Sequence, residues 1–262
     1  MPDPEFTTVG YPNPEVPKAF LYSEKLGKEV GADILIATDP DCDRVALEVR
    51  DKNGEYVFLN GNRIGALLSY YIFSQRHALN NLPENPVLVK SIVTGDLSKT
   101  IAKKYGIETV ETLTGFKNIC GKTNEYDVTK EKNYVFGYEE SIGFCYGTFV
   151  RDKDAVGASM MVVEMAAYYK KQGKSLLDVL NDIYEEFGYY NERQVSLELE
   201  GIEGQQRIGR MMEDFRDNPI KEIGEISLEK IIDFKEGYLD FPKQNCLKYY
   251  LNDGSWYALR PS

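Results

Sequence analysis

Residues 33–44 read DILIATDPDCDR, an apolar run that ends abruptly in acidic residues. The apolar part, DILIAT, is too short for a helix and almost continuously hydrophobic, which predicts a buried strand. Carboxylates on alternate residues follow directly: Asp39, Asp41 and Asp43. Carboxylates this close together repel one another unless a cation neutralises them. The stretch therefore predicts a strand of an α/β fold whose end holds a metal ion.

The ligands on offer favour Mg²⁺ or Mn²⁺. Carboxylate oxygens are hard ligands that suit these ions better than zinc, and three of them leave positions for a phosphate oxygen or water. The loop does not fit a calcium-binding EF-hand, because Arg44 and Arg50 replace the glycine and glutamate that an EF-hand needs. Two alternatives stay open: a haloacid-dehalogenase-type phosphatase with Asp39 as nucleophile, and an acidic surface turn without a metal.

Composition and charge indicate a globular protein and exclude several partners. The 262 residues are 42% hydrophobic and 28% charged, with a net charge of −11. Such an acidic surface repels phosphate backbones, so we expect no nucleic acid, and a phosphorylated ligand would need a metal or a local basic cluster. No apolar run approaches the length of a membrane span, and the N-terminal residues lack the basic and apolar regions of a signal peptide.

Cysteine and histidine usage points to a reducing cytoplasm. The four cysteines are scattered, with no CxxC pair, which fits free thiols. The single histidine, His77, is expected at the surface near a helix end. With one histidine in the chain, we expect neither a zinc site nor a Ser-His-Asp triad.

Hydrophobic periodicity predicts alternating strands and helices. A helix that ends at Gly31 precedes the DILIAT strand, and residues 44–59 predict a hairpin with its turn at Asn53-Gly54. Further strands are expected over 85–95, 107–115, 133–141, 193–201 and 254–262, and further helices over 62–75, 96–106, 157–172, 175–187 and 204–217. The strand–helix–strand order implies parallel strands, so the fold class is α/β, with mixed sheets flanked by helices.

Residues that start and stop helices support two of these predictions. Asp96 is the candidate N-cap and Gly106 the candidate C′ residue of one helix. Ser175 and Asp178 match a capping box, and Gly188 is the expected end of that helix.

Four unusual loops follow four of the predicted strands: DPDCDR, TGD at 94–96, TGFK at 114–117 and GYEES at 137–141. Ligands of open α/β sheets bind beyond the carboxyl ends of the strands. We therefore expect the loops to share one rim, which would combine carboxylates, hydroxyls and backbone amides.

The stretch GYEESIGFCYGTFVRDKDAVG, residues 137–157, carries groups suited to a phosphorylated sugar. Glu139 and Ser141 can hydrogen-bond to vicinal hydroxyls. Arg151 and Lys153 can meet a phosphate, Arg151 through its fork of donors and Lys153 as a point charge. A solvated run of charges is the alternative for RDKD taken alone.

With these motifs the chain resembles the α-D-phosphohexomutase family, in its phosphoglucomutase and phosphomannomutase branch. ATDPDCDR is similar to the metal loop of that family, TLTGFK to its third-domain hinge motif, GYEESIG…RDKDAVG to its sugar loop, and ALRPS to the start of its phosphate-binding loop. The resemblance implies three parts: the end of domain two in 1–59, all of domain three in 60–190, and the truncated, α+β start of domain four in 191–262.

The resemblance also implies a reaction and a set of roles. In the family, a phosphoserine of the first domain exchanges its phosphoryl group with a hexose phosphate through a bisphosphate, which moves phosphate between O1 and O6. Glucose or mannose 1- and 6-phosphates and the 1,6-bisphosphate are the implied ligands, and pentose phosphates stay open. The resemblance implies that Asp39, Asp41 and Asp43 are the ligands of Mg²⁺ and that Arg44 stabilises the phosphoryl group. The implied substrate contacts are Thr114, Gly115, Glu139, Ser141, Arg151, Lys153, Arg260 and Ser262. Among these, Lys153 would lie beside the reacting oxygen.

The sequence departs from that family in two places. It lacks the serine loop Thr-Ala-Ser-His-Asn-Pro, and ALRPS is not followed by Gly-Thr-Glu-Pro. We therefore expect a fragment of a mutase without turnover of its own. A non-enzymatic module that binds sugar phosphates is a further alternative.

Overall fold

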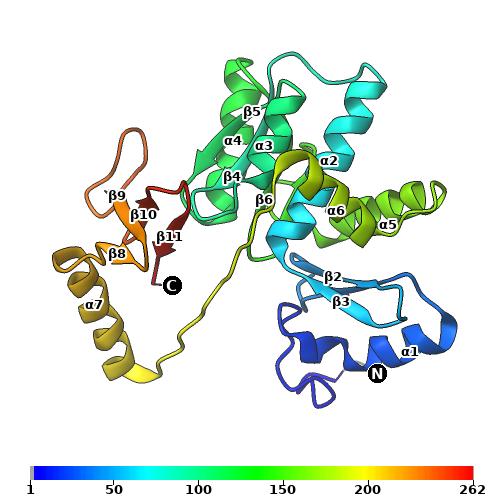
Figure 1. Cartoon of the computed structure of the whole chain (residues 1–262), viewed down its shortest axis with the longest axis horizontal. Helices are drawn as coiled ribbons and strands as arrows, with labels where there is room; N and C mark the ends of the chain where they lie inside the picture. The colour runs from blue at the N-terminus through cyan, green and yellow to red at the C-terminus, as the bar shows by residue number, and fades with distance from the viewer. Residues whose placement is uncertain (1–2, 262) are drawn as a thin grey trace. The chain divides into compact units, whose positions relative to one another are not determined.

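The computed structural model describes residues 3–261 and divides into two compact units, the first ending at Glu192 and the second beginning at Arg193 (Figure 1). The observed fold is mixed α/β, as the sequence predicted. Among the described residues, no helix is both long and apolar enough to cross a membrane. The three domain ranges remain a prediction.

A three-stranded antiparallel sheet opens the first unit. Its strands β1 (Ile34–Thr38), β2 (Val45–Arg50) and β3 (Tyr56–Leu59) pair in the order β1-β2-β3. The short helix η1 (Pro17–Phe20) and helix α1 (Leu21–Val30) precede it. Gly31 ends α1 with a positive φ of 70°, and Gly54 turns the β2–β3 hairpin with a φ of 85°, so both predicted breaks are confirmed.

A four-stranded sheet forms the rest of this unit, in the order β5-β4-β6-β7. Strand β4 (Pro86–Ser91) is parallel to β5 (Glu108–Thr112) and β6 (Asn133–Glu139), while β7 (Gly143–Tyr146) is antiparallel to β6. Helix α3 (Leu97–Lys104) connects β4 to β5, which confirms the predicted parallel unit. The carboxyl ends of β4, β5 and β6 therefore lie at one edge.

Helices cover both faces of the four-stranded sheet. Alternate residues of β4 point to opposite faces and pack against different helices. Val87 and Val89 pack with α4 (Phe116–Thr129), and Leu88 packs in the larger core with α2 (Gly61–Ala78), α5 (Ala155–Lys170) and α6 (Leu176–Phe187). That larger core also contains Val45 and Leu47 of β2, so the two sheets of the unit share it.

Three helix boundaries agree with the sequence and one helix was missed. The Ser175–Asp178 capping box is present, Gly188 ends α6, and Gly106 follows α3 with a φ of 68°. Asp96 stands at the N-cap of α3, but its side chain makes no capping hydrogen bond there. The sequence did not predict α4, whose buried residues recur at helical spacing: Phe116, Ile119, Cys120, Thr123 and Tyr126.

The second unit packs one helix on an antiparallel sheet. Helix α7 (Gly201–Asp217) is followed by β8 (Glu222–Ile223), β9 (Ile226–Asp233), β10 (Leu247–Leu251) and β11 (Trp256–Leu259), in the sheet order β11-β10-β9-β8. The predicted strand over 193–201 is wrong. Its alternating residues Val195 and Leu197 are 76% and 58% exposed, and residues 193–200 have no regular structure, because no strand of the described chain pairs with them.

Candidate metal centre and the loops around it

The three aspartates after β1 converge. One carboxylate oxygen from each of Asp39, Asp41 and Asp43 lies within 4.8 Å of the other two. Asp39 is buried, Asp43 is half-buried and Asp41 is exposed. A small group of oxygens that is buried at one side and open at the other can bind a hard cation while leaving room for a further ligand.

The Asp39 carboxylate also folds the loop that carries it. Its Oδ1 accepts the backbone N–H groups of Asp43 at 3.1 Å and Arg44 at 2.9 Å, and its Oδ2 accepts Arg44 Nε at 2.7 Å. These bonds hold Cys42 in the left-handed region, at a φ of 60°, which is uncommon for a residue other than glycine. The spacing of Asp39, Asp43 and Arg44 thus stabilises the turn that brings the candidate metal ligands together.

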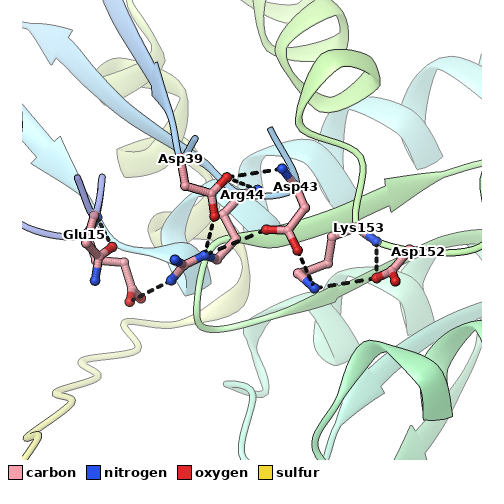
Figure 2. Close-up of polar contacts among 7 residues, drawn as sticks. Glu15, Asp39, Asp43, Arg44, Asp152 and Lys153 are labelled. Atoms are coloured by element: carbon pink, nitrogen blue, oxygen red, sulfur yellow. Dashed lines mark hydrogen bonds and ion pairs between the residues drawn. The ribbon is translucent and has the colours of Figure 1, made fainter. Parts of the chain in front are cut away.

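Two basic side chains join this cluster from different segments, as Figure 2 shows. Arg44 lies between Asp39 and Asp43, and its Nη1 is 3.8 Å from Oε2 of Glu15. Lys153 Nζ lies 2.7 Å from Asp43 Oδ2. Lys153 Nζ also lies 3.4 Å from Asp152 Oδ1, so five carboxylates meet two cations, and the excess negative charge favours a bound cation.

The pKa values of Asp39 and Asp43 are shifted in opposite directions. Burial raises the pKa of Asp39, but the hydrogen bonds from Arg44 outweigh it and hold the pKa below its usual value. Burial also raises the pKa of Asp43; Lys153 opposes this and the Asp39 charge adds to it, and the pKa stays above its usual value. A nearby cation would favour the ionised form of Asp43, against the shift that burial and the Asp39 charge cause.

The metal loop meets the other loops although β1 belongs to a different sheet. Arg44 forms an isolated β-bridge with Gly143, Val45 N–H donates to the Ile142 carbonyl at 3.1 Å, and Ala155 N–H donates to the Cys42 carbonyl at 3.2 Å. Only three of the four loops thus follow strands of one sheet. Backbone hydrogen bonds bring the fourth beside them.

Gly143 lets the Lys153 stem pass through this junction. A Cβ at Gly143 would lie 2.5 Å from Cδ of Lys153 and 3.0 Å from its Cγ. The Lys153 ammonium also lies 5.6 Å from the centre of the Phe116 ring, at the start of α4. The glycine of the ESIG motif is therefore required by the close approach of a predicted site residue.

The predicted sugar-binding residues gather where β5 and β6 end. Gly115 N–H donates to Oε1 of Glu139 at 2.5 Å, with Gly115 at a φ of 105°. Thr114 and Glu139 are buried, and Ser141 is half-buried two residues beyond Glu139. The structure brings Gly115 and Glu139 into direct contact, with Thr114 and Ser141 close to them in the sequence.

The remaining predicted residues are Arg151, Arg260 and Ser262. The Arg151 guanidinium forms an ion pair with Asp127 of α4. Arg260 is exposed and belongs to the second unit. Ser262 lies outside the described residues.

The sequence missed two charged residues near the rim, Lys90 and Glu140. Lys90 is fully buried at the end of β4, and Glu140 accepts hydrogen bonds from Ser91 and Thr94. A lone lysine in the apolar strand VLVKSIV was the available signal, because an unpaired charge would not be placed in a sheet interior.

Family models match most of the chain. Residues 1–54 match domain II and residues 60–187 match domain III of phosphoglucomutase/phosphomannomutase, each described as alpha/beta/alpha. The chain belongs to the phosphoglucomutase/phosphomannomutase family. The predicted resemblance is confirmed, and the dehalogenase-type alternative is not favoured.

Relatives of known name agree with this membership. Phosphoglucomutase of Staphylococcus epidermidis is 38% identical over 272 residues, and the same holds for that of Staphylococcus aureus MRSA252; each alignment covers 100% of this chain and 48% of the relative. The chain thus spans about half the length of these curated relatives.

Two solved structures show the same fold at low identity. A protein of Thermus thermophilus, named as a phosphomannomutase, aligns with a TM-score of 0.67 and 21% identity over 100% of this chain and 47% of its own. The phosphoglucomutase parafusin of Paramecium aligns with a TM-score of 0.59 and 18% identity over 92% of this chain and 42% of its own.

Proposed function

We propose that this chain is the metal-binding and sugar-binding part of a phosphohexomutase, an isomerase that moves a phosphoryl group between O1 and O6 of a hexose phosphate. The observation that carries the proposal is the convergence of Asp39, Asp41 and Asp43, in a loop hydrogen-bonded to the Ile142–Gly143 segment. That segment directly follows Glu139 and Ser141, so metal-type ligands and sugar-type contacts share one rim.

Each residue has a role that its chemistry allows. The three aspartates hold Mg²⁺, which would neutralise phosphoryl oxygens when bound. Arg44 and Lys153 bring positive charge to the same place, since phosphoryl transfer depends on positioning and charge neutralisation. Glu139 and Ser141 form hydrogen bonds with sugar hydroxyls, and Thr114 and Gly115 line the sugar site beside them. Arg151, Arg260 and Ser262 are further phosphate contacts.

The finer parts of the proposal concern ligand and compartment. The ligands are glucose or mannose 1- and 6-phosphates and their 1,6-bisphosphate, with pentose phosphates as the alternative within the family. The enzyme works in the cytoplasm, consistent with four free cysteines. Because this sequence has no serine loop of the Thr-Ala-Ser-His-Asn-Pro type, the chain by itself binds these ligands without converting them.

Calorimetry of the purified chain with glucose 1,6-bisphosphate, with and without Mg²⁺, tests this function. Binding that strengthens with Mg²⁺ is expected. Glu139→Gln should weaken it about tenfold, because a charged acceptor becomes neutral and one of its oxygens is replaced by an NH2 donor. Glu131→Gln, a change at an exposed glutamate, is the matched control and should bind as wild type does. Absence of any binding by the wild-type chain would contradict the proposal.

A phosphate-release assay separates the mutase from a phosphatase. Incubation with glucose 1-phosphate and Mg²⁺ should yield neither glucose 6-phosphate nor inorganic phosphate. Release of inorganic phosphate that disappears in Asp39→Asn would instead establish the phosphatase.

A further inference from the structure

The proline-rich stretch YPNPEV, residues 11–16, forms an ordered turn of the first unit, directly before helix η1. Val16 N–H donates to the Asn13 carbonyl at 3.1 Å, and Glu15 N–H donates to Asn13 Oδ1 at 3.0 Å. Pro14 is buried at the second position of this turn, where the proline ring fixes φ in advance. The backbone at Glu15 is therefore held in place.

The Glu15 side chain extends from this turn to Arg44, as Figure 2 shows. Its Oε2 lies 3.8 Å from Arg44 Nη1, and 27% of the side chain is exposed. Burial raises the pKa of Glu15 above its usual value; the Arg44 charge opposes this shift and the Glu140 charge adds to it. The guanidinium is therefore the neighbour that favours the ionised form of Glu15.

Arg44 contacts carboxylates through two of its three nitrogens. Its Nε donates to Asp39 Oδ2 at 2.7 Å, and its Nη1 faces Glu15. Because a guanidinium is planar and rigid, contacts at two nitrogens fix the direction of the whole group. The carboxylates that pair with Arg44 among the described residues lie at Nε and Nη1, which leaves the N–H groups of Nη2 for a phosphoryl oxygen.

The two sides of the guanidinium carry opposing attractions. Asp43 Oδ1 lies 3.8 Å from Nε, and Figure 2 shows Asp43 and Glu15 on opposite sides of the guanidinium. Asp43 is one of the candidate metal ligands. If Glu15 were neutral, the aspartates alone would attract Arg44, and the guanidinium would turn towards Asp43. Glu15 thus balances the pull of the metal loop on its own arginine.

We propose that Glu15 is a positioning residue for Arg44: it holds one end of the guanidinium while Asp39 holds the other, so that Nη2 is presented to the phosphoryl group. The inference deepens the proposed function and rests on it, because Arg44 is the residue assigned to that group. Without the Glu15 carboxylate, a ligand must first turn Arg44 into place. Affinity for a phosphorylated sugar then falls, although Glu15 itself does not contact the ligand.

A double-mutant cycle on the binding of glucose 1,6-bisphosphate with Mg²⁺ tests whether Glu15 acts through Arg44. Glu15→Gln should weaken binding about fivefold in the wild-type background and hardly at all beside Arg44→Met, because the group that it positions is then absent. Glu5→Gln, at an exposed glutamate that also precedes η1, is the matched control and should bind as the wild type does. Equal losses in both backgrounds would mean that Glu15 contacts the ligand, and tighter binding would mean that it competes with phosphate for Arg44; either result overturns the proposal.

Nitrogen NMR of the Arg44 side chain tests the positioning step without a ligand. In the wild type, at a mildly alkaline pH that keeps Glu15 ionised, slow rotation about the Nε–Cζ bond should give separate Nη1 and Nη2 signals. Glu15→Gln should speed this rotation and merge them, whereas Glu5→Gln should not. This measurement decides the outcome if Arg44→Met does not fold or binds no ligand. Arg44 signals that stay unchanged in Glu15→Gln overturn the role of Glu15 alone, whereas a wild-type chain that binds no bisphosphate contradicts the proposed function.

Discussion

Two groups of acidic side chains lie at strand ends in the first unit, and they differ in what stands among them. After β1, oxygens of Asp39, Asp41 and Asp43 face one another within 4.8 Å, with Arg44 and Lys153 at the side. After β4, Asp96 and Glu111 each lie 3.0 Å from the ammonium of Lys90. Under the proposed function the first group takes a cation from solution, while the second contains its own.

The difference follows from where each group sits on its strand. The aspartates occupy a loop, where Asp41 is exposed and a hydrated ion can enter. Lys90 is the penultimate residue of a central strand, where no ion can exchange and a covalently attached charge is needed. A solvent-accessible site can thus be reversible, whereas a buried one is permanent structure.

Glu48 of β2 is a third, different case: among the described residues, this carboxylate has no ion pair with a basic side chain, and it is not part of the aspartate group. Its side chain is 2% exposed, and among the described residues Oε2 has no hydrogen-bond partner. Burial, with a smaller contribution from Glu24, raises its pKa to about 7. Below about pH 7, protonation of this carboxyl group takes the place of a cation.

The largest expected effect is on the buried lysine. Lys90→Met should lower the free energy of unfolding by about 3–5 kcal/mol, because two carboxylates are left without their partner. Lys104→Met, at an exposed pair, should cost about 0–1 kcal/mol. Urea unfolding at neutral pH measures both, and equal small losses would remove the distinction between the two acidic groups.

Glu48→Gln should change how stability depends on pH. The folded pKa of about 7 lies above that of an unfolded glutamate, so the wild type loses stability as pH rises towards 7 and does not regain it above. The variant should be more stable than wild type at pH 8 by roughly 3 kcal/mol, with the pH-dependent gain vanishing near pH 4. Unfolding across this range, with the exposed Glu29→Gln on α1 as control, tests the sign; a gain that is independent of pH would contradict it.

Asp41→Asn should weaken divalent-cation binding about tenfold, because a charged ligand becomes neutral. Stability should hardly change, since Asp41 is exposed. Electron paramagnetic resonance of free Mn²⁺ gives the affinity. Asp240→Asn, at an exposed aspartate of the second unit, should bind Mn²⁺ like the wild type. Tight, unaltered binding in Asp41→Asn would place the metal elsewhere.

Lys153→Met should have the smallest effect and the opposite sign. Its ammonium competes for Asp43 Oδ2 at 2.7 Å, so its removal should tighten Mn²⁺ binding about threefold. The same resonance measurement applies, with Lys174→Met at an exposed pair as control. Weaker binding in Lys153→Met would mean that Lys153 organises the aspartates and does not compete for them.

Local sequence was sufficient for much of this protein. DILIAT followed by alternating aspartates predicted a strand and the loop in which these aspartates converge, and Ser175 with Asp178 marked a helix start, because turns and caps depend on neighbouring residues. The expected burial of that strand is wrong, since only Leu35 of β1 is buried and β1 lies at the edge of its sheet. The same reasoning failed at 193–201, where an alternating pattern lacks a partner strand, since pairing is never a local property.

The tertiary structure alone decided how distant segments meet. The sequence around residue 44 does not predict that this loop, which belongs to one sheet, forms hydrogen bonds with residues 142–143 of another. The sequence around residue 90 likewise does not predict that Lys90 lies between Glu111 and Asp96. The sequence by itself determined which charged and polar groups are available to the proposed metal and sugar-phosphate site. Packing determined which of those charges would be neutralised within the protein and which were left for a cation, because burial and charge pairing depend on residues far apart in the chain.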